Sequence, residues 1–243
     1  METKRRRVSS ESPPVTDSPP VMDSHLGGLL RVYPSLLLKR QIERAQGDLF
    51  GVTLVDSPPL DKGDGPFLWR RPPIVVHGRP CRQRRSVGFF VGDKAVRGYA
   101  YSGRVAPAQP MAGLPVLEQL LGVANRALEG TKSVKFNSAL VNSYADGSDY
   151  ISAHSDDVTH LVKPAVVAAF SFGASRTFRV RDKRTKKVEL DVPLDSGSFL
   201  VMMPGFQARY THEVPKTAPG VSRRVSVTFR EHLPQRASSS NSE

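Results

Sequence analysis

The chain has 243 residues and 39% are hydrophobic, which is enough to bury one good core and a small second lobe. Its formal net charge of +12 favours polyanionic partners, nucleic acid before an anionic membrane, with a basic protein lacking such a partner as the alternative. The single cysteine, Cys81, excludes an internal disulfide and a cysteine-based zinc site, and no apolar run approaches the roughly 18 residues that span a bilayer. We therefore expect an intracellular protein without a membrane partner.

Both ends of the chain have the composition of disordered tails. Residues 1–26 are rich in Ser, Pro and charge, and residues 233–243 end in a Ser-rich run. The stretch "KRRR" at positions 4–7 fits either a nuclear localisation signal or a basic terminus that no partner recognises. We expect a nuclear protein.

Residues 27–132 contain two helical patterns. In residues 34–47 apolar side chains recur at near-helical spacing, and Gly47 predicts the helix end. The clearer pattern covers residues 114–130, where Pro115 suits the first turn, an apolar stripe faces the core and Gly130 closes the helix. Both helices are expected to pack on the core.

A basic and aromatic segment lies between these helices. A short apolar strand at 74–76 runs into His77, and four arginines that could face phosphates follow: Arg79, Arg82, Arg84 and Arg85. Tyr99 and Tyr101 are two positions apart, which on a strand turns both rings to one face. Ordinary half-buried strand aromatics are the competing interpretation.

From residue 133 to 232 the pattern changes to short strands separated by Gly, Pro, Asn and Asp turns, which predicts a barrel or sandwich. The run "AVVAAFSF" is apolar on both faces, so it should form a central strand. The basic run at 176–187 fits either phosphate contacts or a solvated hairpin.

His154 and Asp156 flank one serine, and in an extended segment both side chains point to the same side. An imidazole and a carboxylate on one face supply two-thirds of a facial triad for ferrous iron, although such a pair is often only a polar loop. The third ligand must come from elsewhere. His212, on a predicted strand 56 residues after Asp156, is the strongest candidate, ahead of His25, His77, His160 and His232.

Arg224 and Arg230 are six positions apart on the last predicted strand, so both should lie on one face. Two arginines inside a barrel are costly without an anion, and a dicarboxylate co-substrate would supply one. A solvent-facing basic edge strand is the alternative.

Taken together, the segments "NSYADGSDYISAHSDD", "AFSFGASRTFRVRD", "GSFLVMMPGFQARYTHEVP" and "SRRVSVTFR" resemble the AlkB family of iron(II)- and 2-oxoglutarate-dependent dioxygenases. The resemblance covers roughly residues 70–231 and is greatest to the animal and plant nucleic-acid repair members. It implies a mainly β (α+β) fold: a double-stranded β-helix, or jelly-roll, core at 133–232. N-terminal helices and a nucleotide-recognition lid at 27–132 would precede that core.

The resemblance also implies roles for individual residues. The iron ligands would be His154, Asp156 and His212. The 2-oxoglutarate site would comprise Asn142, Tyr144, Arg224 and Arg230. The substrate base would meet Tyr99 and Tyr101, with His77 on the loop that wedges into a duplex in some members. The arginines that follow His77 would contact the nucleic-acid backbone.

Two departures from the duplex-repair members concern substrate choice. Those members carry an acidic residue four positions after the first histidine, where this chain has Val158, and Asp157 is the candidate substitute. The wedge position is His77 rather than a large apolar residue, which makes single-stranded DNA or RNA more plausible.

The leading hypothesis is an oxidative demethylase that removes N-linked alkyl groups from bases such as 1-methyladenine and 3-methylcytosine, in DNA or RNA. The resemblance implies Fe(II), O2 and 2-oxoglutarate as cofactor and co-substrates and formaldehyde as a product, and we expect a monomer. The alternatives are a non-enzymatic nucleic-acid binder with a degenerate site and a 2-oxoglutarate oxygenase acting on a protein side chain.

Overall fold

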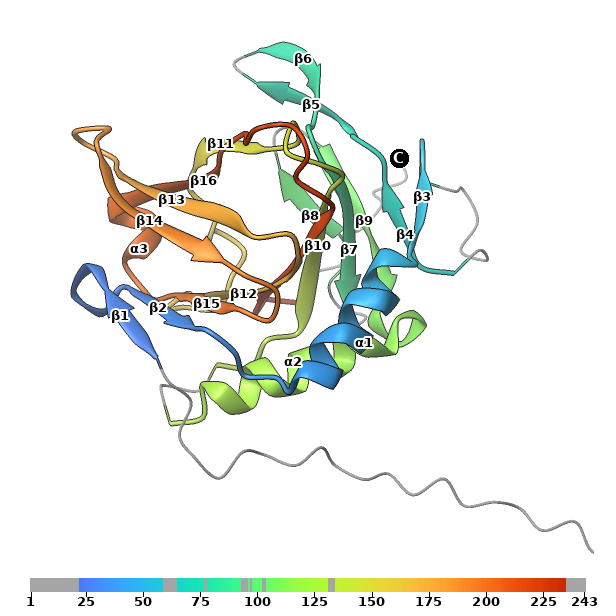
Figure 1. Ribbon diagram of the computed structural model, residues 1–243, viewed down its shortest axis with the longest axis horizontal. Coiled ribbons are helices and arrows are strands. Elements are labelled where there is room, and N and C mark those ends of the chain that lie inside the picture. The colour runs from blue at the N-terminus through green and yellow to red at the C-terminus, as the bar shows by residue number, and fades with distance from the viewer. Residues whose placement is uncertain are drawn as a thin grey trace, which may run out of the picture.

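The computed structural model describes residues 22–58, 65–76, 78–92, 96, 98–101, 104–130 and 134–234. Two β-sheets face one another and two helices cover the outer face of the larger sheet (Figure 1). The mainly β, jelly-roll fold predicted from the sequence is confirmed. No helix in this part of the chain is long and apolar enough to span a membrane.

The large sheet is built around strands from the second half of the chain. Its strand order is β1 (Asp23–His25), β2 (Leu30–Tyr33), β15 (Phe199–Met202), β12 (Val167–Gly173), β17 (Arg224–Arg230), β10 (Ser138–Tyr144), β7 (Ser86–Val91), β4 (Phe67–Trp69) and β3 (Thr53–Val55). The hairpin of β8 (Gly98–Tyr101) and β9 (Arg104–Pro110) joins it through β7. As predicted, the apolar run that forms β12 is central, between β15 and β17.

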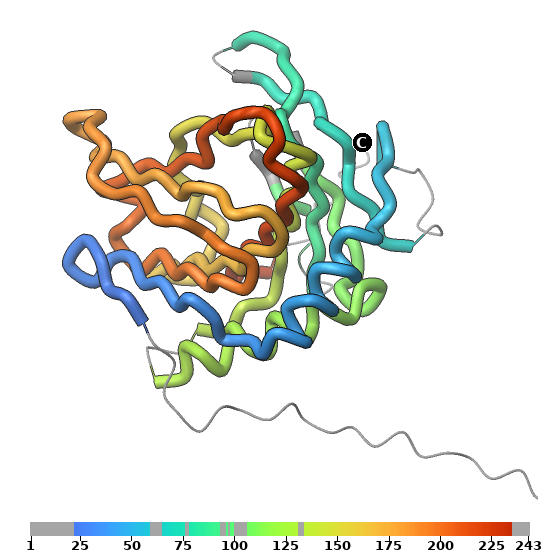
Figure 2. The backbone as a smooth tube through the Cα atoms, viewed as in Figure 1, coloured from blue at the N-terminus to red at the C-terminus, as the bar shows by residue number. Residues whose placement is uncertain are grey.

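The smaller sheet has the order β11 (Ile151–His154), β16 (Tyr210–Val214), β13 (Arg176–Asp182) and β14 (Val188–Leu194). A separate hairpin, β5 (Pro73–Val76) with β6 (Arg79–Arg82), projects beyond the two sheets (Figure 2). This hairpin carries part of the arginine-rich segment and lies in the region expected to form the nucleotide-recognition lid.

Alternation along the strands separates two kinds of interior. The odd positions Val225, Val227 and Phe229 of β17 pack with α1 (Lys39–Phe50) and α2 (Pro115–Ala127) in the main hydrophobic core. The even positions of the same strand line a cavity between the sheets. Beyond that cavity a second apolar cluster contains residues of both sheets, and the short helix α3 (Phe206–Arg209) contributes Phe206 to it.

Helix α1 differs from the prediction over residues 34–47. It begins at Lys39, after Leu38, whose backbone N–H donates to the Gln41 side chain, and it continues through Gly47 to Phe50. Glycine inside a helix costs about 1 kcal/mol, but burial of Leu49 in the main core favours the extra turn. Helix α2 lies within the predicted range of 114–130.

The N-terminal boundary also differs from the prediction. The composition of residues 1–26 predicts a disordered tail, whereas residues 23–25 form β1 and pair with β2. Backbone pairing at a sheet edge needs little apolar sequence, so composition did not reveal it. Strands β2 and β7 pair with β15 and β10, so the segments 27–132 and 133–232 share one sheet.

Candidate functional site

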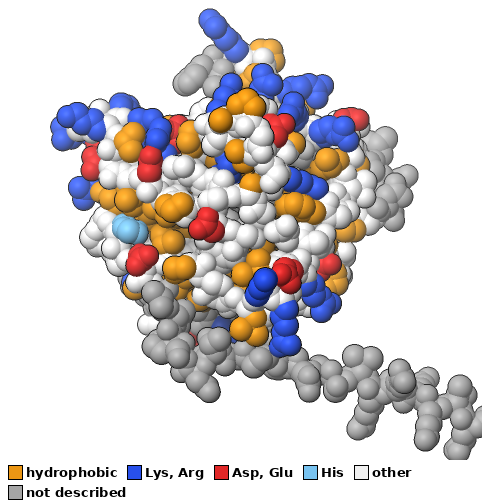
Figure 3. Space-filling view, viewed as in Figure 1, with side chains coloured by type: hydrophobic (Ala, Val, Ile, Leu, Met, Phe, Trp, Pro, Cys, Tyr) orange, Lys and Arg blue, Asp and Glu red, His pale blue; other side chains and the backbone are white. Residues whose placement is uncertain are grey.

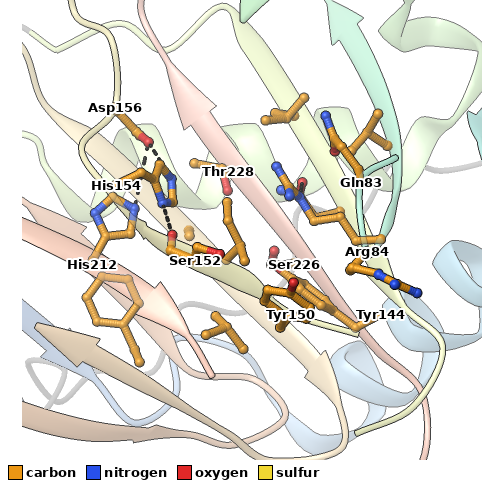
Figure 4. Close-up of a pocket in the computed structure, with 18 of the residues that line it drawn as sticks. Gln83, Arg84, Tyr144, Tyr150, Ser152, His154, Asp156, His212, Ser226 and Thr228 are labelled. Carbon is orange, nitrogen blue, oxygen red and sulfur yellow. Dashed lines mark hydrogen bonds and ion pairs between the residues drawn. The ribbon is translucent and has the colours of Figure 1, made fainter. Parts of the chain in front are cut away.

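A cavity of about 590 Å³ lies between the two sheets. Its large-sheet wall comes from alternate residues of β10 and β17, because the antiparallel register sets Asn142 opposite Ser226 and Tyr144 opposite Arg224. Its other wall comes from β11, β16 and the segment after β11. Figure 4 shows the two ends: Asp156, His154 and His212 gather at one, and Tyr144, Tyr150 and Ser226 lie at the other.

The three predicted metal ligands are together at the first end. Pairing of β11 with β16 sets His154 directly opposite His212. Their Nε2 atoms lie 3.5 and 3.7 Å from Asp156 Oδ1, and the ligand atoms of all three residues lie within 4.8 Å of one another. Strand β11 ends at His154, so Asp156 reaches the cavity from the following loop rather than from an extended strand.

The donor set fits ferrous iron. Two imidazoles and one carboxylate converge from one side, as in sites that hold Fe(II) and leave positions for co-substrates. The ring orientation of His154 is fixed, since its Nδ1 lies 2.9 Å from the Ser152 carbonyl oxygen (Figure 4). The His212 ring stacks on Phe178 with centroids 5.1 Å apart.

The surroundings keep Asp156 and His212 in the protonation states that bind metals. Burial, together with the charge of His154, lowers the pKa of His212 to about 3, so its imidazole is neutral at physiological pH. Burial alone would raise the pKa of Asp156, but the Arg230 guanidinium and both imidazoles outweigh it and hold that pKa well below the usual value. Arg230 donates to Asp156 Oδ2 over 2.6 Å.

The second end of the cavity holds a buried positive charge with neutral partners. Arg224 is 2% exposed, donates to the Ser171 hydroxyl over 2.8 Å and lies against the Tyr144 ring. Within the described residues, neither its Nε nor its Nη1 finds an acceptor, and no carboxylate forms an ion pair with it. A buried guanidinium with free donors fits a carboxylate ligand, so the residues present suit 2-oxoglutarate.

Asn142 and Tyr144 both line the cavity, and the Tyr144 ring lies against Arg224. Arg85, however, differs from the other three arginines of its segment. Its Nε donates to Asn142 Oδ1 over 2.8 Å and its side chain is half-buried, whereas Arg79, Arg82 and Arg84 are exposed. Arg85 immediately precedes β7, and its hydrogen bond to Asn142 on β10 turns its side chain inward. It therefore does not share the exposed position of its neighbours.

Among the residues expected to contact the substrate, Tyr99 lines the cavity, with its ring centroid 5.1 Å from the Arg230 guanidinium carbon. It stacks on Phe89 at 5.4 Å. Burial raises the pKa of Tyr99, which keeps its hydroxyl protonated. Asp157 also lines the cavity but is exposed, and its Oδ1 accepts hydrogen bonds from the Thr159 backbone N–H and hydroxyl.

Two expected substrate contacts are not described in full. His77 lies outside the described residues, and for Tyr101 the structure describes the backbone in β8 only. Of the other histidines in the described part of the chain, His160 is exposed and His232 is buried with its Nδ1 2.7 Å from the Ser138 hydroxyl, and neither joins the cluster of His154, Asp156 and His212.

Basic side chains gather around the β5–β6 hairpin at the top of Figure 3. The exposed arginines of this segment are Arg79, Arg82 and Arg84, and the last two also line the cavity. The basic run at 176–187 behaves differently. Arg179 and Arg181 form ion pairs with Asp191 and Glu213, so the exposed cations of that run are confined to the β13–β14 turn: Arg184, Lys186 and Lys187.

Arg176 is a residue whose individual role the sequence did not reveal. It is 2% exposed, and its guanidinium donates to the carbonyls of Asp146, Asp149 and Pro215. It therefore anchors the loop that joins β10 to β11, and with it the ends of two cavity-lining strands. Its membership of a basic run concealed this role, because composition does not distinguish a buried arginine from an exposed one.

Comparison with known proteins agrees with this geometry. Residues 59–230 match the 2OG-Fe(II) oxygenase superfamily, over more than half of the chain. The chain is 29% identical over 193 residues to the DNA oxidative demethylase ALKBH2 of Arabidopsis thaliana, covering 70% of this chain and 60% of that protein. It is 38% identical over 144 residues to the alpha-ketoglutarate-dependent dioxygenase alkB homolog 3 of Rattus norvegicus, covering 56% and 47%.

A third relative, the ALKBH2 of Mus musculus, is 37% identical over 143 residues, covering 56% of this chain and 57% of that protein. The chain thus spans about half the length of the curated relatives it matches. The solved structure of OsALKBH1 superimposes with a TM-score of 0.54 at 16% identity, covering 87% of this chain and 100% of that one, which supports the fold.

Fe(II), 2-oxoglutarate and O2 are the cofactor and co-substrates of the matched superfamily, and the His-Asp-His cluster fits the metal. The chain therefore belongs to the 2OG-Fe(II) oxygenase superfamily, and its similarity to these relatives confirms the predicted resemblance to the AlkB family.

Proposed function

We propose that the protein is an oxidative demethylase that removes N-linked methyl groups from nucleobases in DNA or RNA and releases formaldehyde. One observation carries the proposal: a single cavity holds the His-Asp-His cluster at one end and the buried, uncompensated Arg224 at the other. The class of candidate substrates includes 1-methyladenine and 3-methylcytosine.

In this proposal His154, Asp156 and His212 hold Fe(II), which when bound supplies the activation of O2. Arg224 binds the distal carboxylate of 2-oxoglutarate, with Asn142 and Tyr144 beside it, and Arg230 keeps Asp156 ionised and oriented. A co-substrate between the two ends would bring its keto-acid end near the metal ligands, while Ser226 and Thr228 line the wall between them.

The side of the cavity that would receive the substrate favours a nucleobase as that substrate. A base must leave the stack to be reached by a recessed site, and aromatic walls are where an extruded base is held. Tyr99 would supply such a wall, and the exposed Arg79, Arg82 and Arg84, within and just after the β5–β6 hairpin, would contact phosphates. The relatives named for DNA oxidative demethylation add support. We further propose a monomeric, nuclear protein.

Mass spectrometry of methylated oligonucleotides tests the proposal. The protein is incubated with Fe(II), ascorbate and 2-oxoglutarate and with single- and double-stranded DNA and RNA, beside an Asp156→Ala control. We expect the methylated base to lose the mass of one CH2 unit, because a hydrogen replaces the methyl group, and formaldehyde to form. Turnover of 2-oxoglutarate with no methyl loss on any strand would instead favour a protein side chain as substrate. Methyl loss that persists in Asp156→Ala would refute the metal assignment.

A further inference from the structure

The Asp156 main chain is held by a side chain from outside both sheets. Asp156 lies two residues beyond the end of β11, past the ladder that pairs β11 with β16. A backbone N–H in a partly buried loop needs an acceptor, because an unpaired one costs free energy. The Asp156 N–H donates to Gln207 Oε1 over 2.9 Å, across 51 positions of sequence. Gln207 belongs to the short helix α3.

A second contact orients the Gln207 amide. Its Nε2 donates to the Met202 sulfur over 3.2 Å. A thioether only accepts hydrogen bonds and a backbone N–H only donates them, so one orientation of the amide satisfies both neighbours. Gln207 is not among the described residues that line the cavity, whereas Asp156 and Met202 are. The contact of Gln207 with the site is therefore indirect.

Helix α3 is a fixed support for this amide. Phe206 is fully buried, and its ring lies 5.5 Å from the Tyr210 ring and 6.1 Å from the His212 ring. On the other side Lys183, just after β13, donates from Nζ to the Gln207 carbonyl over 2.6 Å. The helix is thus held both by the second apolar cluster and by the β13–β14 turn.

Asp156 is held at both of its ends. Gln207 binds its main chain, and Arg230 donates to its Oδ2 over 2.6 Å. Its Oδ1, 3.5 and 3.7 Å from the two imidazole Nε2 atoms, is the oxygen that faces the other ligands. The Ser155 hydroxyl adds a bond of 2.8 Å to the first carbonyl of β16. Since α3 leads directly into β16, which carries His212, these bonds tie the loop of one ligand to the strand of another.

We propose that Gln207 is a positioning residue of the metal centre, whose amide oxygen fixes the Asp156 main chain and with it the spacing of Asp156 and His212. The inference rests on the metal ligands of the proposed function. Hydrogen bonds from outside the ligand set hold ligands ready for the metal, and loss of one typically lowers metal affinity by about 10- to 100-fold.

Calorimetric titration with Mn(II) tests this inference on five proteins: wild type, Gln207→Met, Gln207→Glu, Arg209→Met and Asp156→Ala. Gln207→Met keeps the length of the side chain and removes the acceptor, so Mn(II) affinity should fall by about tenfold or more. Gln207→Glu keeps an oxygen for the Asp156 N–H, so its affinity should stay within about threefold of wild type. The matched control Arg209→Met changes an exposed residue of the same helix and should bind Mn(II) as wild type does.

Urea unfolding of the metal-free proteins separates positioning from stability. A residue that only supports the fold would lower the urea midpoint and leave the Mn(II) affinity unchanged at a temperature where every variant is folded, because binding then involves the folded state alone. We expect Gln207→Met to unfold cooperatively and still to bind Mn(II) more weakly than Gln207→Glu.

Three outcomes overturn the inference. The first is a Gln207→Met variant that binds Mn(II) as tightly as wild type, and the second is a Gln207→Glu variant as weak as Gln207→Met. The third is an equal loss of affinity in Arg209→Met. Failure of the metal assignment looks different, since Asp156→Ala would then bind Mn(II) as tightly as wild type. Failure of the demethylase function would leave all the titrations as expected, while no oligonucleotide loses its methyl group.

Discussion

The two ends of the cavity use buried arginine in opposite ways. Arg230, at the metal end, has a carboxylate 2.6 Å away and is charge-compensated within the fold. Arg224 lies six residues earlier on the same face of β17, is equally buried and has a hydroxyl and an aromatic ring as its partners. Burial of a charge alone therefore does not distinguish a structural arginine from a ligand-binding one. The presence or absence of an internal counter-charge makes that distinction.

The largest expected effect comes from breaking the ion pair between Asp156 and Arg230. Asp156→Ala removes a proposed metal ligand and leaves Arg230 buried and unpaired. Demethylation should fall by about a thousandfold or more, and the free energy of unfolding should drop by roughly 3–5 kcal/mol. Oligonucleotide mass spectrometry and urea unfolding measure the two effects.

Asp157→Ala is the matched control, because this neighbouring aspartate is exposed and outside the metal cluster. Its unfolding free energy should stay within about 0.5 kcal/mol of wild type. If Asp156→Ala is equally mild, the ion pair with Arg230 does not support the fold as argued.

Removing Arg224, which lacks an internal counter-charge, should change stability in the opposite direction from Asp156→Ala. Arg224→Met removes a buried charge that lacks a counter-ion, so the metal-free protein should be as stable as wild type or more so. Affinity for 2-oxoglutarate should fall by about 100-fold, equivalent to roughly 2.7 kcal/mol, because the carboxylate loses a charge-assisted donor.

Thermal denaturation at increasing concentrations of 2-oxoglutarate checks this prediction. Mn(II) is added in place of iron. The co-substrate should raise the melting temperature of wild type and leave that of Arg224→Met almost unchanged. A variant that is destabilised yet still gains stability from 2-oxoglutarate would show that Arg224 is a structural residue.

A third prediction concerns His232, a buried histidine whose imidazole is neutral at physiological pH. Burial lowers the pKa of His232 to about 4, with smaller effects from Arg230 and His160. Since the unfolded value is near 6.5, the unfolded chain binds the proton first as pH falls. Stability from this group is complete above about pH 6.5 and is lost towards pH 4, by about 2 kcal/mol at about pH 5.

Urea unfolding of wild type and His232→Gln at about pH 7.5 and about pH 5, both without metal, isolates this effect. His212 titrates in both proteins, so the difference between their pH responses belongs to His232. Equal losses in the two proteins would contradict the prediction.

The smallest effect is expected outside the cavity. Arg84 is exposed, and Arg84→Ala should change the unfolding free energy by less than about 0.5 kcal/mol. If Arg84 contacts a phosphate, the slope of log affinity against log salt should decrease in magnitude by about 1. Fluorescence anisotropy with one labelled oligonucleotide across a salt series measures that slope. An unaltered slope would remove Arg84 from the proposed backbone contacts.

Local sequence predicted much of the site because strand alternation is a short-range property. The even spacing of Arg224 and Arg230 placed both on the cavity face of β17, while Val225 and Val227 face the main core. Local sequence is wrong about helix α1: Gly47 predicts the helix end, whereas packing of Leu49 extends the helix to Phe50. Tertiary burial outweighed a local propensity of about 1 kcal/mol there.

The sequence by itself determined which side chains share a face and which family the chain resembles, since period, turn residues and motif order are all written along the chain. Tertiary structure alone decided which faces meet. It set His154 opposite His212 through the β11–β16 register, buried Arg176 within a run of exposed cations, and turned Arg85 into the cavity through Asn142. Each of these depends on contacts between residues at least 27 positions apart, as between Arg176 and Asp149, which no local pattern encodes.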